Sequence, residues 1–187
     1  SLNYQEAVDS VNRLKAAGTD PKATESVLIL LSQDIEDWVQ NQELSFLNDI
    51  IAQVQEKIAL YSEPNLRTWT ESVRRSRMQA LLEINDSLQE WKAVSEAGGT
   101  VKEPGLPLEI RLQQAASSMK VQVKAENKQL LTAFLKTSSL DSVLDRTTGN
   151  LDLREVGQEN RDAINNLLKI VGANGENWTE WLRDDSI

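Results

Sequence analysis

Apolar residues recur every three or four positions along most of the chain, and these runs are interrupted by proline and glycine. The spacing is the period of an amphipathic α-helix, whereas the alternation typical of a β-strand is nearly absent. The interruptions lie at residues 18–21, 64, 98–107, 149, 157 and 172–175. The pattern predicts an all-α protein: an elongated antiparallel bundle of long helices with a C-terminal cap of shorter helices.

The first half of the chain predicts four helices. Residues 3–17 form the first, and Asp20 followed by Pro21 is a start signal for the next. Between there and Pro64 two apolar stripes differ in phase by about 100° around a helix, or one residue. We therefore expect a break at the polar residues 40–43; a single kinked helix is the alternative. The stripes consist of Val27, Leu28, Leu31, Ile35 and Trp38, and of Leu44, Leu47, Ile51, Val54, Ile58 and Tyr61.

The longest predicted helix covers residues 64–97 and ends at Gly98–Gly99. Its apolar stripe consists of Leu66, Trp69, Val73, Ala80, Leu81, Ile84, Leu88, Trp91 and Val94. Three glycines and two prolines make residues 98–107 the clearest linker of the chain. The sequence thus predicts a bundle over residues 1–97, a linker over 98–107, and a segment over 108–187 that completes the same domain.

The second half is predicted to begin with a long helix over residues 108–136. Residues 139–146 are expected to form a two-turn helix, and residues 147–150 a turn. A helix over 158–171 and a last short helix, which carries Trp178 and Trp181, complete the expected cap.

Histidine and cysteine are both absent from the 187 residues. This excludes zinc sites of the usual kind, His-ligated haem, phosphohistidine relays, and both Ser-His-Asp and Cys-His catalysis. The two common phosphate-binding glycine loops are also missing, so we expect no cofactor and no metal. A chain without disulfides fits a reducing compartment, so we expect a cytoplasmic protein; secretion without disulfides is the alternative.

The formal charge is −9 at pH 7. An acidic balance argues against binding to nucleic acid or to anionic membranes, both of which need concentrated Lys and Arg. No apolar run approaches the roughly 20 residues needed to cross a bilayer, and no signal-peptide pattern is present. We therefore expect a soluble protein that inserts into no membrane.

Two basic clusters are candidate docking sites for a protein partner. Lys120, Lys124 and Lys128 follow one another at four-residue spacing, which forms a basic row beside the core side of a helix. The second cluster consists of arginines, whose forked side chains suit carboxylates or phosphates. The alternative for both clusters is an ordinary charged surface with ion pairs to neighbouring helices. The second cluster consists of Arg67, Arg74, Arg75 and Arg77.

Two further features have both a binding and a structural interpretation. Trp178 and Trp181 on a short acidic helix either anchor a partner or cap the bundle. The run from Asp145 to Asn150 is weakly similar to loops that carry an acceptor aspartate, but a calcium loop fails on ligand spacing. A polar turn is the expected structure there.

The favoured function is a non-enzymatic protein–protein interaction, scaffold or regulatory module, whose partner is another protein or a second copy of the chain. One alternative is a helical sensor of a small ligand, which needs an apolar cavity with a few polar groups. The other is a secreted effector, or an enzyme that works without His and Cys, for which Arg74, Arg75 and Asp145 are the first candidates.

Overall fold

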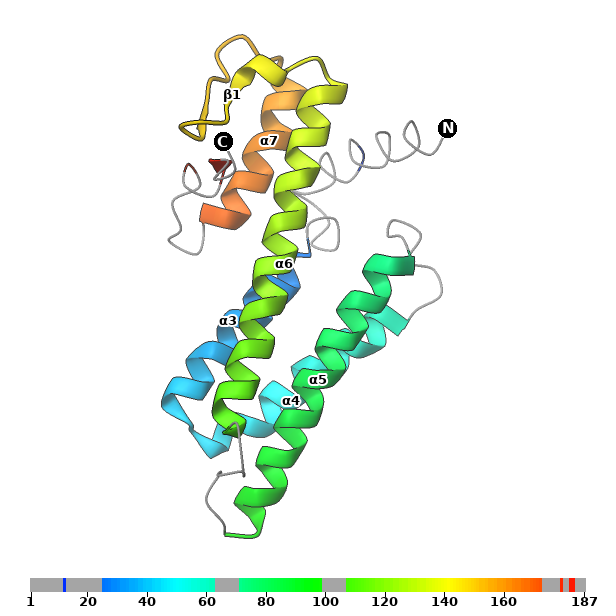
Figure 1. The fold of residues 1–187 in the computed structure, drawn as a ribbon, viewed down its shortest axis with the longest axis vertical. Coiled ribbons are helices and arrows are strands. Elements are labelled where there is room, and N and C mark those ends of the chain that lie inside the picture. Colours follow the sequence, from blue (N-terminus) through cyan, green and yellow to red (C-terminus); the bar gives the residue numbers. More distant parts are fainter. Residues whose placement is uncertain are drawn as a thin grey trace. The chain divides into compact units, whose positions relative to one another are not determined.

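The structure of the protein is a computed structural model, which describes residues 12, 25–62, 71–98, 107–172, 179, 182 and 183. Within these residues the chain is almost entirely helical (Figure 1), which confirms the predicted all-α bundle class. The α-helices are α3 (Ser26–Asn41), α4 (Leu47–Ser62), α5 (Glu71–Glu96), α6 (Leu108–Thr137) and α7 (Gln158–Gly172). The 3-10 helices are η1 (Leu44–Phe46) and η2 (Asp141–Val143), and the strands are β1 (Leu144–Asp145) and β2 (Asn150–Leu151).

Helix ends agree with the sequence where the described residues include them. The break predicted at residues 40–43 is confirmed, because α3 ends at Asn41 and α4 begins only at Leu47. Helix α5 ends at Glu96, next to the predicted stop at Gly98. Gly98 has a left-handed φ of 74°, and its N–H donates to the Ser95 carbonyl. The predicted helix over 3–17, the Asp20–Pro21 start signal and the short helix with Trp178 and Trp181 lie outside the described residues.

The chain divides into two compact units. The first covers Val27–Val123, and the second combines Ser1–Ser26 with Lys124–Ile187. In the first unit α4 packs on α5 (Figure 1), and buried side chains from α3, α4, α5 and the first half of α6 form one core. The predicted stripes supply most of this core, including Ile35, Val54 and Leu88, each with no exposed surface. The predicted linker over 98–107 stays a prediction.

The second unit has its own apolar core. The second half of α6 contributes Leu130, Leu131, Phe134 and Leu135 to it. Buried residues of α7, together with Leu144 and Leu182, complete it. Each unit therefore buries its apolar side chains around a separate cluster, and α6 runs as one continuous helix from the residues of one unit into those of the other.

Two expectations from the sequence are wrong. Leu44, which we assigned to the apolar stripe of α4, belongs to η1 and is 55 % exposed. The two-turn helix expected over 139–146 is absent: η2 is followed directly by β1, which pairs with β2 in antiparallel register. The reason is that Ser139, with a φ of 58°, ends α6 in a left-handed conformation, and Leu140 N–H then donates back to the Leu135 carbonyl.

The turn predicted at residues 147–150 is present as the loop between the two strands. The Asp145 carboxylate accepts the backbone N–H of Thr147 at 3.0 Å, and the Asp145 carbonyl accepts that of Gly149 at 2.7 Å. An aspartate that accepts backbone N–H groups two residues on is a standard turn former. Asp145 therefore has a structural role in this hairpin.

None of the helices in the described ranges combines the length and the apolar character required to cross a membrane.

Candidate functional site

The connection between α3 and α4 is an ordered elbow, which we define as residues 42–46. Gln42 adopts a left-handed φ of 51°, and its N–H donates to the Trp38 carbonyl at 2.6 Å. This single bond closes α3 in the manner of a left-handed cap. The indole N–H of Trp38 then donates to the Glu43 carbonyl at 2.9 Å, which fixes the first residues after the turn.

Contacts with other helices hold the elbow on the core of the first unit. The Gln42 side-chain amide donates to Oε2 of Glu109, at the start of α6, at 2.9 Å. Trp38 packs edge-to-face against Trp91 of α5, with 4.8 Å between ring centroids and 68° between ring planes. Both tryptophans are buried. The elbow is therefore a fixed part of the surface, as a binding site requires.

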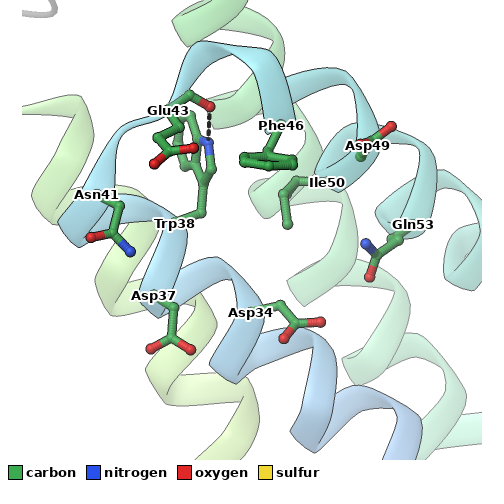
Figure 2. A pocket seen from close by; sticks show the side chains of 9 residues that line it. All are labelled: Asp34, Asp37, Trp38, Asn41, Glu43, Phe46, Asp49, Ile50 and Gln53. Atoms are coloured by element: carbon green, nitrogen blue, oxygen red, sulfur yellow. Dashed lines mark hydrogen bonds between the residues drawn. The ribbon is translucent and has the colours of Figure 1, made fainter.

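A pocket of about 330 Å³ opens between the end of α3, the elbow and the start of α4 (Figure 2). Its apolar lining combines buried Trp38 and Ile50 with the ring of Phe46, which is 53 % exposed. Around them lie carboxylates and amides from α3, the elbow and α4. These polar residues are Asp34, Asp37, Asn41, Glu43, Asp49 and Gln53.

Two carboxylates of this elbow pocket, those of Asp34 and Asp37, are placed at an electrostatic cost. Burial, and next the negative charge of Asp37, raise the pKa of Asp34 from its ordinary value of 3.8. Asp37 lies one turn before the carboxyl end of α3, where the helix dipole is negative, and the last turn of α3 contains no basic residue. Among the described residues that line the pocket, none is Lys or Arg.

We predict that Asp34→Asn makes the protein more stable at neutral pH. Like charges three residues apart on a helix cost about 0.2–0.5 kcal/mol, and the variant removes one such pair. Because the folded state raises the pKa of Asp34, the ionised carboxylate opposes folding above that pKa, and the difference between variant and wild type must close as the pH falls through it. Urea unfolding at neutral and acidic pH measures both effects.

Asp49→Asn is the matched control for this prediction. Asp49 lies in the first turn of α4, where a carboxylate interacts favourably with the positive end of the helix dipole. The same chemical change should therefore lower stability there, by about 0.3–1 kcal/mol. A loss of stability in both variants would contradict the electrostatic cost that we assign to Asp34.

The lysines of the row predicted from the sequence interact with other residues of the same chain. The Lys120 ammonium lies 2.7 Å from Oε2 of Glu36, and the Lys128 ammonium donates to the Arg183 carbonyl at 2.8 Å. Lys124 is half-buried and also interacts within the chain. Docking of an acidic partner on this row stays a prediction, and it would have to displace these contacts.

The structure describes only part of the predicted arginine cluster. Arg74 donates to the Tyr61 carbonyl at 3.4 Å, and exposed Arg75 interacts within the chain. Arg77 has no exposed surface, so it does not belong to a surface patch. Arg67 lies outside the described residues, as do Trp178 and Trp181, and the proposed role of these residues in partner binding stays a prediction.

Two further pockets lie in the second unit. One, of about 320 Å³, is lined by Lys128, Arg146 and the apolar side chains of Leu144 and Leu182, among others. The other lies beside Arg154, whose guanidinium is held by Asp152 at 2.7 Å. That hydrogen-bonded pair lowers the pKa of Asp152 to about 2. The third charged residue of this pocket, Arg161, donates to the Val156 carbonyl at 3.0 Å.

The elbow pocket is thus the best-defined candidate site, and the sequence did not lead us to it. One signal was present: Leu30, Asp34, Asp37 and Asn41 recur at helical spacing on the polar side of α3. No group of acidic residues within the described ranges is arranged to hold a metal ion. Comparison with family models, with curated proteins and with solved structures finds no match to this chain.

Proposed function

We propose that this chain is a non-enzymatic protein-interaction module and that its elbow pocket is where another protein docks. The observation that carries the proposal is the exposure of two large apolar side chains on one ordered elbow. Leu44 is 55 % exposed and Phe46 is 53 % exposed, and the ring of Phe46 lines the pocket. Exposed apolar groups beside a polar rim are typical of protein interaction sites, where aromatic side chains are enriched.

The geometry favours docking of a protein over capture of a free small molecule. Ligand pockets usually bury about 70–90 % of the ligand in a mostly apolar cavity. In the elbow pocket only Trp38 and Ile50 of the lining residues are buried, and six of the nine are exposed. A shallow apolar centre with an exposed polar rim matches the anatomy of a protein interface instead.

Selection from a displayed library of random peptides tests this proposal even though the partner is unidentified. We expect the selected peptides to bind the wild type and to lose about tenfold or more in affinity for a Leu44→Ser/Phe46→Ser variant, as when an interface hot spot is removed. Both side chains are largely exposed, so the variant should stay within about 0.5 kcal/mol of the wild-type stability.

Leu82→Ser is the matched control. Leu82 lies on α5 of the same unit and is 45 % exposed, but it does not line the elbow pocket. The selected peptides should bind this variant as they bind the wild type. Peptides that lose affinity equally for both variants, or for neither, would show that the elbow is not the docking site.

A further inference from the structure

The side of α3 that faces the elbow pocket continues beyond the pocket as one row. Leu30, Asp34, Asp37 and Asn41 are spaced by four, three and four residues, which places them on one side of a helix. All four are exposed, and Leu30 is 51 % exposed. Seven residues along a helix span about 10 Å, so this row presents an apolar contact about 10 Å from Asp37.

The charge of the pocket defines the charge of its occupant. Asp34 and Asp37 from α3, Glu43 from the elbow and Asp49 from α4 surround the opening. Two lysines of the same unit are already paired elsewhere, Lys57 with Glu56 and Lys120 with Glu36. A cation from outside would relieve the repulsion between Asp34 and Asp37. Phosphate groups of nucleic acids and of anionic lipids would be repelled.

The apolar centre of the pocket favours a cation that is carried on an aliphatic chain. Lysine and arginine carry their charge on a long aliphatic stem, which packs on apolar surface while the charged end stays at the rim. Trp38, Ile50 and Phe46 offer that surface, and Phe46 also presents an aromatic ring to the cation. A cation over the face of an aromatic ring is attracted by the negative charge of that face.

We infer that the elbow pocket takes one arginine or lysine side chain from a segment of another protein, and that an apolar residue of the same segment, about 10 Å further along, packs on Leu30. In a helical segment that distance separates residues seven positions apart. This inference rests on the proposed function, because it names the partner of the same site.

The test uses a single synthetic helical peptide with one arginine and, seven positions away, one leucine. We expect Asp34→Asn/Asp37→Asn to weaken its binding about tenfold or more, and Leu30→Ser to weaken it further. Fluorescence anisotropy with a labelled peptide gives both affinities. The first variant should be at least as stable as the wild type, so lost binding cannot be attributed to unfolding.

Glu83→Gln/Asp86→Asn is the matched control for the pocket variant. These two carboxylates are exposed on α5, also three residues apart, and the variant changes the net charge by the same amount. Binding should be unchanged. Equal losses in the two double variants would overturn the inference, because the peptide would then sense only net charge.

Charge exchange provides a readout that a structural role would not give. With glutamate in place of its arginine, the peptide should fail to bind the wild type and should bind an Asp34→Arg variant. Failure of this rescue would overturn the inference. Selected peptides that depend on Phe46 but contain no arginine or lysine would overturn it as well, while they would leave the proposed function standing.

Two other occupants are distinguished by simple measurements. Free arginine amide that binds as tightly as the peptide would replace the protein partner with a small cation. A dimer of the wild type in light scattering that Asp34→Asn/Asp37→Asn converts to a monomer would make the occupant a second copy of the chain. Either result would overturn the inference.

Discussion

Replacing Trp91 by alanine is expected to lower the free energy of unfolding by about 3–5 kcal/mol, the usual cost of deleting a buried tryptophan. Trp91 is 2 % exposed and lies in the core of the first unit, so the substitution leaves a cavity that its neighbours can only partly fill. Urea unfolding followed by circular dichroism measures the effect as a lower midpoint. A loss below about 1 kcal/mol would contradict the packing described here.

A double-mutant cycle separates the energy of the contact between the two tryptophan rings from the cost of the cavity. The edge-to-face contact between Trp38 and Trp91 should give a coupling energy of about 0.5–1.5 kcal/mol beyond the loss of buried area. Trp91→Ala combined with Leu131→Ala is the control, because Leu131 belongs to the core of the second unit. The losses in the free energy of unfolding caused by these two substitutions should add to within about 0.5 kcal/mol.

The helices could be predicted because their apolar residues keep one phase over many turns. The stripe of α3 and the stripe of α4 differ by one residue in phase, which no single straight helix accommodates without exposing one stripe. The chain resolves this conflict with a break between Asn41 and Leu47, where the polar residues begin. Burial of Ile35 and Val54 on either side of the break follows from the same pattern.

The elbow pocket could not be predicted, because its geometry depends on backbone conformations that the residue types at those positions do not indicate. Gln42 adopts the left-handed conformation that glycine and asparagine favour, and its side chain does not signal a helix end. Leu44 continues the stripe of α4 in sequence, yet the turn at Gln42 moves it to the surface. The contact of Trp38 with Trp91, which supports the pocket, joins residues 53 positions apart.

The hairpin of the second unit was missed for a different reason. Its strands are only two residues long, too short for an alternating pattern to appear in the sequence. The signals that define it are Asp145, which accepts the N–H groups of the turn, and Gly149, with a left-handed φ of 77°. Gly149 is also buried, which a glycine in an ordinary exposed turn would not be. Gly149 is buried because backbone atoms of Thr179 and Arg183 lie next to it.

Gly149→Ala is expected to destabilise the second unit by about 2–4 kcal/mol, from left-handed strain and overpacking together. A Cβ at this position would lie 1.8 Å from the Thr179 carbonyl oxygen and 3.1 Å from the Arg183 backbone nitrogen. These are backbone atoms, so no side-chain rotation relieves the clash. Urea unfolding of the variant, compared with wild type, measures the loss.

Substitutions at two other glycines separate the cost of the left-handed backbone conformation from the cost of the steric clash. Gly98 also has a left-handed φ, 74°, but nothing lies within 4 Å of its added Cβ, so Gly98→Ala should cost only about 1–2 kcal/mol. Gly157 has neither constraint, and Gly157→Ala should stay within about 0.5 kcal/mol of wild type. If Gly149→Ala cost no more than Gly98→Ala, the close approach of Thr179 to the hairpin would be wrong. The larger loss at Gly149 would instead mean that the C-terminal segment is held against this turn, because only that contact distinguishes the two left-handed glycines.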